Sequence, residues 1–131
     1  MQLYIDTSAL VKLVTVEQES AALRSYLEQT VDDAEFTAAI TRTELVRAAA
    51  RLRNADIGRQ ATLLLTRLQF VEISPALLDA AAALPPPELR APDAIHLAAA
   101  LTAPELRALV TYDSRLAEAA TAAGLTVVSP A

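Results

Sequence analysis

The stretch Leu3-Tyr4-Ile5-Asp6-Thr7-Ser8, close to the start of the chain, decides the fold. Its three apolar residues form a short run that is typical of a buried strand, and the run ends at the acid Asp6. After Ser8 the apolar residues recur at helical spacing, through Leu10 and Leu13. A buried strand that leads straight into a helix is the start of a βαβ unit, and such units build a parallel sheet.

The same alternation of strand and helix patterns continues to the end of the chain. Further strands are predicted at residues 36–38, 70–73, 108–111 and 125–128, and further helices at residues 17–27, 41–52, 57–68, 75–84, 91–101 and 114–123. Ser74 and Pro75 suit the cap and the first residue of a helix, and Gly124 suits the position after a helix end. We therefore expect an α/β fold in which helices cover both faces of one mainly parallel sheet.

The composition indicates a globular protein that forms a single domain over residues 1–131. Hydrophobic residues make up 53% of the chain and charged residues 21%, which argues against disorder. The absence of Cys excludes a disulfide framework, a thiolate zinc site and a Cys nucleophile. The sequence has no signal peptide and no apolar stretch of membrane-spanning length, so we expect a cytoplasmic protein with no membrane partner.

The net charge of −5 argues against a protein that coats nucleic acid through bulk positive charge. It does not exclude nucleic-acid chemistry, because acids that cluster around divalent cations no longer repel phosphate. A pocket with two divalent ions would bring the net charge from −5 to −1, since the ions add 4.

Four acids fall at the level where ligands bind in open α/β sheets, outside the carboxyl ends of the strands. Asp6 ends the first strand and Asp113 follows a later one, while Glu44 and Asp93 fall in the first turns of predicted helices. If the topology brings them together, their repulsion must be relieved by protonation or by a hard cation such as Mg²⁺ or Mn²⁺. Such a site suits phosphodiester hydrolysis, because it can activate water and stabilise charge on a phosphate.

Each acid also has a simpler structural explanation, and the residues alone leave both explanations open. Asp6 and Asp113 precede helical patterns and suit N-caps. The stretch Thr41–Glu44 has the spacing of a capping box, with Glu44 reaching back to the amide of Thr41. Asp93, directly after Pro92, suits the positive end of a helix dipole.

At these acids the chain resembles PIN-domain proteins, and specifically the VapC-type toxin ribonucleases of type II toxin–antitoxin systems. The similarity rests on four blocks that stand in the family's order and together cover essentially the whole chain. They are Tyr4-Ile5-Asp6-Thr7-Ser8-Ala9-Leu10, Thr43-Glu44-Leu45, Pro92-Asp93-Ala94-Ile95-His96-Leu97-Ala98 and Val110-Thr111-Tyr112-Asp113-Ser114-Arg115-Leu116. The third block is the most specific of the four.

The resemblance implies a fold, an activity and partners. It implies a PIN-like three-layer α/β/α sandwich with a mainly parallel sheet flanked by helices. It implies a metal-dependent endoribonuclease that cleaves RNA with water activated by Mg²⁺ or Mn²⁺. A small cognate antitoxin, whose peptide covers the active cleft, would hold the toxin inactive, in a homodimer or a toxin–antitoxin hetero-oligomer.

The resemblance also implies roles for particular residues. It makes Asp6 and Asp93 direct metal ligands, and Glu44 and Asp113 the acids that complete the cluster directly or through water. Two hydroxyls are candidates for orienting ligands or waters, and these are Ser8 and Thr111. His96, three residues after Asp93, is expected to be a packed or supporting histidine rather than a ligand or a general base.

Other polar and apolar groups have two explanations each. Arg42, Arg47, Arg51 and Arg115 are candidates for RNA phosphate contacts, with a solvated face or pairing to antitoxin acids as the alternative. The acid-rich stretch with Asp32, Asp33 and Glu35 is expected to be solvated. The apolar Leu63–Leu65 segment suits core packing, and the alternative is a groove for a dimer partner or an antitoxin.

Rival functions fit less well. A receiver-type signalling domain needs a Lys late in the chain, whereas the only Lys is Lys12, and the predicted strand at 70–73 ends without an Asp. An aspartyl-nucleophile phosphatase needs an Asp two positions after Asp6, where this chain has Ser8. The remaining rival is a catalytically silent PIN-like module that binds RNA or a partner, and the presence of all four acids counts against it.

Overall fold

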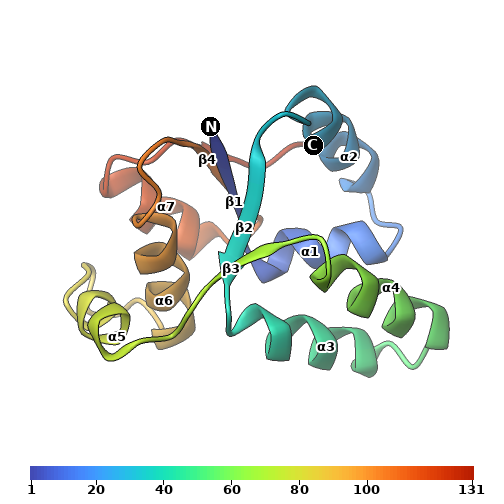
Figure 1. Ribbon diagram of the computed structural model, residues 1–131, viewed down its shortest axis with the longest axis horizontal. Coiled ribbons are helices and arrows are strands. Elements are labelled where there is room, and N and C mark those ends of the chain that lie inside the picture. The colour runs from blue at the N-terminus through green and yellow to red at the C-terminus, as the bar shows by residue number, and fades with distance from the viewer.

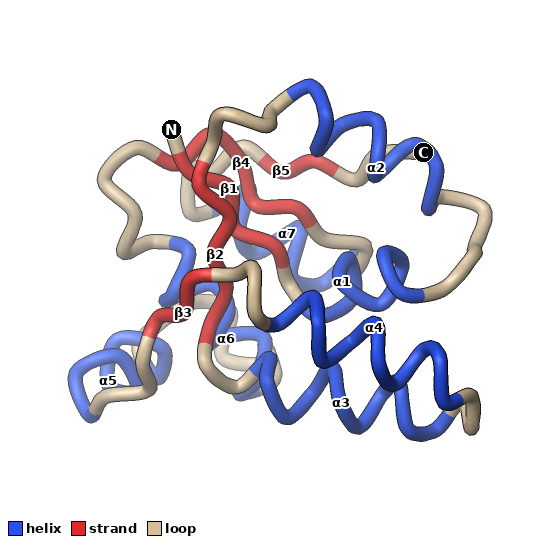
Figure 2. Tube along the Cα trace, turned by 45° about the vertical axis from the view of Figure 1, so that its right-hand side comes forward, coloured by secondary structure: helices blue, strands red, loops and turns tan.

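Five strands form one fully parallel sheet in the order β3-β2-β1-β4-β5, in a computed structural model that describes residues 1–131 (Figures 1 and 2). The strands are β1 (Gln2–Ile5), β2 (Ala34–Ala38), β3 (Gln69–Val71), β4 (Leu106–Val110) and β5 (Val127–Val128). The strand β1 lies in the centre, and its apolar run Leu3–Ile5 has no exposed surface. The prediction that this run is a buried strand is confirmed.

Seven helices cover the two faces of the sheet. They are α1 (Thr7–Val14), α2 (Ser20–Gln29), α3 (Thr41–Arg51), α4 (Ala55–Leu65), α5 (Pro75–Ala82), α6 (Ala91–Ala100) and α7 (Ser114–Ala122). Figure 1 shows α1 to α4 on one side of the strands and α5 to α7 on the other. The expected three-layer α/β/α arrangement is confirmed. None of the helices combines the length and the apolarity needed to cross a bilayer.

The core divides along the alternation of side chains in β1. Leu3 and Ile5 pack with Leu10, Leu23 and other residues of α1 to α4 on one face. Tyr4 points to the opposite face, where it joins residues of α6 and α7. A polar side chain is thus buried at the centre of the sheet, and its hydroxyl must find hydrogen-bond partners inside the protein.

Several predicted boundaries were wrong. The helix expected from residue 17 begins at Ser20. Glu17 lies just before the turn that precedes this helix, and its amide donates a hydrogen bond to Ser20 Oγ at 2.9 Å. The helix α4 ends at Leu65, and Leu68 is buried in the connection beyond it. The strand β5 begins at Val127, since only two of its residues pair with β4 at the sheet edge. The predicted cap of α5 is confirmed, because Ser74 Oγ accepts a hydrogen bond from the amide of Leu77 at 3.1 Å.

Replacement of the two glycines by alanine should have opposite effects on the stability of the fold. Gly124 has a φ of +92° after the end of α7, where an L side chain is strained, whereas Gly58 lies inside α4 with open space around an added Cβ. Gly124→Ala should lower the free energy of unfolding by about 1–2 kcal/mol. Gly58→Ala should raise it by roughly 0.5–1 kcal/mol. Urea unfolding of both variants measures the two shifts, and shifts of the same sign would contradict this assignment of the backbone.

Candidate metal-binding active site

All four predicted acids lie at the carboxyl end of the sheet. Asp6 follows β1 directly, and Asp113 follows β4 after two residues. Glu44 and Asp93 occupy the first turns of α3 and α6. Because β1 and β4 are parallel neighbours with Ile5 opposite Val110, the residues that follow these strands emerge side by side.

Asp6 is the most buried of these acids, with 4% of its surface exposed. Its Oδ1 accepts hydrogen bonds from Ser8 Oγ at 2.7 Å and from the amide of Ala9 at 3.0 Å. Its Oδ2 accepts one from Thr111 Oγ1 at 2.6 Å. Burial nevertheless raises the pKa of Asp6 above its usual value of 3.8, because the loss of hydration outweighs these hydrogen bonds.

The two hydroxyls that bind Asp6 also connect it to the end of β4. Ser8 Oγ accepts a hydrogen bond from the amide of Tyr112 at 2.9 Å, and Thr111 Oγ1 accepts one from the amide of Asp113 at 3.0 Å. Ser8 and Thr111 therefore hold the Asp6 carboxylate against the segment that carries Asp113. Their hydrogen bonds give both residues an orienting contact with a predicted ligand.

Asp113 and Asp93 have oxygens that the protein leaves free. Asp113 Oδ1 accepts hydrogen bonds from the amides of Arg115 at 2.9 Å and Leu116 at 3.0 Å, and its Oδ2 accepts none. Asp93 is half-buried. Its burial raises its pKa above 3.8, and the charges of Asp113 and Asp6 raise it further, against the opposing effects of His96 and Arg90. The negative charges of Asp113 and Asp6 thus act on the Asp93 carboxyl at this end of the sheet.

Glu44 has a different set of partners from those expected of a capping box. Its Oε1 accepts hydrogen bonds from Thr7 Oγ1 at 2.8 Å and from His96 Nε2 at 2.7 Å. The capping-box alternative is wrong, because Thr41 lies inside α3 and its hydroxyl pairs with Thr37 at 2.8 Å. Burial works to raise the pKa of Glu44, but the hydrogen bond and charge of His96 and the Thr7 hydroxyl outweigh it and lower the pKa.

The donor set at this edge fits a hard divalent cation. All four acids offer oxygen ligands, and no Lys or Arg forms an ion pair with Asp6, Asp93 or Asp113. Burial raises the pKa of both Asp6 and Asp93, and neighbouring acids raise the pKa of Asp93 further, so a cation here would favour the charged form of both carboxyls. No three acidic or histidine side chains lie close enough together in this structure to hold one metal ion between them. The carboxylates therefore share one electrostatic environment without a preformed cage.

Two features of the site had only weak sequence signals. Thr7 and Tyr4 were not predicted to take part, although Thr7 follows Asp6 directly and Tyr4 carries its hydroxyl inside the buried run. Tyr4 Oη lies 2.6 Å from His96 Nδ1, so the two buried side chains are paired. The expectation that His96 is a packed or supporting histidine agrees with this contact. A polar residue inside an apolar strand was the signal available for Tyr4.

The acids near the start of β2 were expected to be solvated, but two of the three form ion pairs in the structure. Asp33 forms ion pairs with Arg107 and with the N-terminal amine of Met1, the latter at 3.4 Å, and only 5% of its side chain is exposed. Glu35 lies 3.6 Å from Arg67. Asp32 alone remains exposed. These ion pairs give the acid-rich stretch a structural role at the amino end of the strands, opposite the carboxyl end where Asp6 lies.

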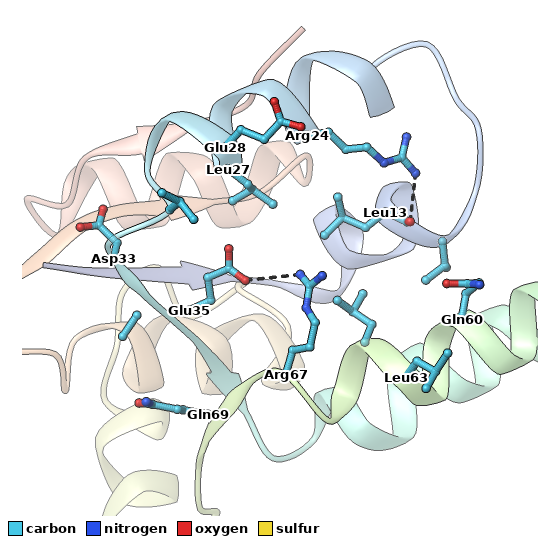
Figure 3. A pocket seen from close by; sticks show the side chains of 14 residues that line it. Leu13, Arg24, Leu27, Glu28, Asp33, Glu35, Gln60, Leu63, Arg67 and Gln69 are labelled. Carbon is cyan, nitrogen blue, oxygen red and sulfur yellow. Dashed lines mark hydrogen bonds and ion pairs between the residues drawn. The ribbon is translucent and has the colours of Figure 1, made fainter.

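A cavity of about 670 Å³ also lies away from the four acids. It opens between α2 and α4, and Figure 3 shows Leu27 and Leu63 facing it from the two helices. Arg67 reaches toward Glu35 across its floor, and Arg24 donates to the carbonyl of Leu13 at 3.1 Å. Within the Leu63–Leu65 segment, Leu63 is exposed and the other two residues pack in the core.

Comparison with known proteins settles the family. The model of the PIN domain matches residues 3–122, which include all four acids. The chain belongs to the PIN-domain family. It is a VapC-type member, because it is 45% identical to Ribonuclease VapC35 of Mycobacterium tuberculosis, over 98% of this chain and 96% of that protein. Ribonuclease VapC46 of the same species is 39% identical, over 98% and 97% of the two chains.

Two solved structures share the fold of this PIN-domain protein. Mycobacterium tuberculosis VapC20, described as a toxin that cleaves the sarcin–ricin loop, has a TM-score of 0.75 with 17% identity, over 98% of this chain and 100% of that chain. VapBC2 from Rickettsia felis, described as bound to a DNA fragment from its promoter, has a TM-score of 0.76 with 14% identity, over all of both chains. At these identities the likeness establishes the VapC-type PIN fold.

The raised pKa of Asp93 predicts a pH effect on stability. A carboxyl whose pKa is higher in the folded state destabilises the fold as the pH rises from its usual value of 3.8 through the folded value. In the absence of metal, Asp93→Asn should therefore unfold at higher urea concentration than the wild type at neutral pH. The difference should vanish at a pH below 3.8. Equal stability at neutral pH would contradict the crowding of negative charge at this edge.

Proposed function

We propose that this VapC-type protein is the toxin of a type II toxin–antitoxin system and acts as a single PIN domain over residues 1–131. Its activity is the hydrolysis of RNA phosphodiester bonds with Mg²⁺ or Mn²⁺. The observation that carries the proposal is the crowding of Asp6, Asp93 and Asp113 at the carboxyl edge of the sheet, where two of the three carboxyls have raised pKa values. Relatives that are named ribonucleases and match along nearly the whole chain support the same reaction.

In this proposal, Asp6 and Asp93 hold the metal directly. Glu44 and Asp113 complete the site through Glu44 Oε2 and Asp113 Oδ2, the oxygens that accept no hydrogen bond from the protein. A bound divalent cation supplies a water of lowered pKa and stabilises the charge that develops on the phosphate. The hydroxyls of Ser8 and Thr111 keep the Asp6 carboxylate in a fixed orientation.

The RNA backbone meets exposed arginines in this proposal. Arg47 and Arg51 lie one turn apart on α3, and Arg115 follows Asp113 at the start of α7. All three are exposed, whereas the ion pairs that arginines form in this chain involve Arg59, Arg67 and Arg107. Free guanidinium groups suit bidentate contacts with phosphate. Aromatic residues make up only 4% of the chain, so base stacking by the protein contributes little.

The reaction predicts a strict dependence on metal and on the buried acids. Asp6→Asn and Asp93→Asn should each lower the rate of RNA cleavage by more than the roughly 100-fold that loss of an outer partner of a metal ligand costs. Addition of a chelator should abolish cleavage by the wild type, and added Mn²⁺ should restore it. Circular dichroism checks that both variants remain folded.

Asp32→Asn is the matched control, because Asp32 is exposed near the start of β2, at the opposite edge of the sheet. It should cleave RNA at the wild-type rate. Cleavage that survives both the chelator and the Asp6 and Asp93 substitutions would overturn the proposed reaction. If the wild type binds RNA without cutting it in the presence of Mn²⁺, the alternative of a catalytically silent PIN-like RNA- or partner-binding module stands instead.

An antitoxin is the proposed protein partner, and the toxin acts in the cytoplasm as a homodimer or in a toxin–antitoxin hetero-oligomer. A short reading frame next to the gene is expected to encode a protein that co-purifies with this chain. The purified pair should cleave RNA at least about tenfold more slowly than the free toxin, since the antitoxin covers the acids. A co-purifying partner that leaves the cleavage rate unchanged would contradict this inhibitory role.

A further inference from the structure

A chain of buried hydrogen bonds runs through the sheet to Glu44. The amide of Ala38, the last residue of β2, donates to Tyr4 Oη at 3.1 Å. Tyr4 Oη lies 2.6 Å from His96 Nδ1, and His96 Nε2 lies 2.7 Å from Glu44 Oε1. The chain thus links β2, β1, α6 and α3. Tyr4 has no exposed surface and His96 has 3%, so water does not compete for these bonds.

The chemistry of the partners sets the direction of this chain. The Glu44 carboxylate can only accept, so His96 Nε2 carries a hydrogen, and in the neutral ring Nδ1 is left as an acceptor. The amide of Ala38 can only donate, so Tyr4 Oη accepts there and gives its own proton to His96 Nδ1. A tyrosine hydroxyl has an ordinary pKa of about 10, so it carries its proton at neutral pH. The hydrogen bonds thus all run in one direction, from the Ala38 amide through Tyr4 and His96 to Glu44 Oε1.

The chain ends on only one of the two oxygens of Glu44. His96 Nε2 and Thr7 Oγ1 both donate to Oε1, and Oε2 accepts no hydrogen bond from the protein. A glutamate has three rotatable side-chain bonds, and 32% of this side chain is exposed, so it would otherwise sample many positions. Two donors on one oxygen restrict the carboxylate and leave the other oxygen available.

Neighbouring rings hold the two links of the chain in place. The Phe36 ring meets the Tyr4 ring edge to face, with centroids 5.1 Å apart. The Tyr4 and His96 rings are also nearly perpendicular, with centroids 5.8 Å apart. Phe36 therefore supports the position of Tyr4 without taking part in the hydrogen bonds. That difference makes Phe36 a control for packing.

We propose that Tyr4 and His96 are positioning residues that hold Glu44 Oε1, so that Glu44 Oε2 faces the divalent cation of the active site. This inference rests on the proposed function, since it needs Glu44 to serve the metal. Neither Tyr4 nor His96 touches the cation. The pair acts by fixing the carboxylate, as hydrogen-bond partners behind metal ligands generally do.

The tautomer of His96 tests the direction of the chain without metal or substrate. His96 is the only histidine, so its ¹⁵N signals in histidine-labelled protein need no assignment by mutation. In the metal-free wild type, the neutral ring should carry its hydrogen on Nε2 alone. Tyr4→Phe removes the hydrogen bond to Nδ1 and should move the ¹⁵N signal of Nδ1 downfield, while the hydrogen stays on Nε2, where the Glu44 carboxylate accepts it. Phe36→Leu keeps the Tyr4 hydroxyl and should retain the wild-type signal of Nδ1. A wild-type ring with its hydrogen on Nδ1 would overturn the inference.

The affinity for Mn²⁺ tests whether the hydrogen bonds of Tyr4 and His96 position the Glu44 carboxylate. Titration with Mn²⁺, followed by electron paramagnetic resonance, should show affinity losses of about 10–100-fold for Tyr4→Phe and for His96→Leu. His96→Gln can still donate an N–H toward Glu44 and should recover part of the loss. Phe36→Leu should bind Mn²⁺ as the wild type does, even where its unfolding transition shows a loss of stability.

The outcomes separate this inference from the proposed function. If the wild type binds Mn²⁺ and Glu44→Gln weakens binding, but Tyr4→Phe and His96→Leu do not, the positioning role is overturned and the metal site stands. If Phe36→Leu lowers the affinity as much as Tyr4→Phe, the effect is one of packing and the inference also fails. If the wild type binds no Mn²⁺, the proposed function is overturned, and the role of Tyr4 and His96 toward a metal is overturned with it.

Discussion

The burial of the Asp6 carboxylate at the end of the central strand is the constraint on which the rest of the site depends. Its position directly after a fully buried run removes it from water, and three protein donors replace only part of its hydration. Those donors come from the start of α1 and from the segment after β4, so the charge ties together the two strands at the middle of the sheet. Asp93 and Asp113 add negative charge to the same edge. A cation at this edge would favour the charged form of these carboxyls.

Helix capping and metal binding do not exclude one another at this site. Asp6 and Asp113 both cap a helix, as their sequence context predicted, and both lie in the acidic cluster. A carboxylate has two oxygens with two lone pairs each, so it can satisfy helix amides and still face a ligand. In Asp113 the cap uses Oδ1, and Oδ2 is left without a protein donor. The parallel sheet produces this double use, because strand ends and helix starts meet at one edge.

The sequence predicted the strands and helices of this fold better than it predicted which side chains contact one another. Apolar runs marked β1 and β4 most clearly, because strands at the middle of a sheet that is covered on both faces carry few polar side chains. The start of α2 and the end of α4 were misplaced, since a turn closed by Ser20 and a buried Leu68 beyond a helix end depend on tertiary contacts. All four acids were found, because they stand beside strand ends and helix starts. The partner of Glu44 was not found, since His96 lies 52 residues away and a local capping box explained the same spacing.

Glu44 and Asp113 share one arrangement, because in each carboxylate one oxygen accepts two hydrogen bonds from the protein and the other accepts none. The donors differ between the two acids. In Asp113, two backbone amides of α7 occupy one oxygen. In Glu44, the Thr7 hydroxyl and His96 occupy one oxygen, because the longer side chain carries its carboxylate away from the amides of α3. A backbone cap needs no further support, whereas the ring of His96 needs a second hydrogen bond, at Nδ1, to be held in the orientation in which Nε2 donates to Glu44. The hydroxyl of Tyr4 meets that need from inside the sheet, which explains a tyrosine at the centre of an otherwise apolar strand.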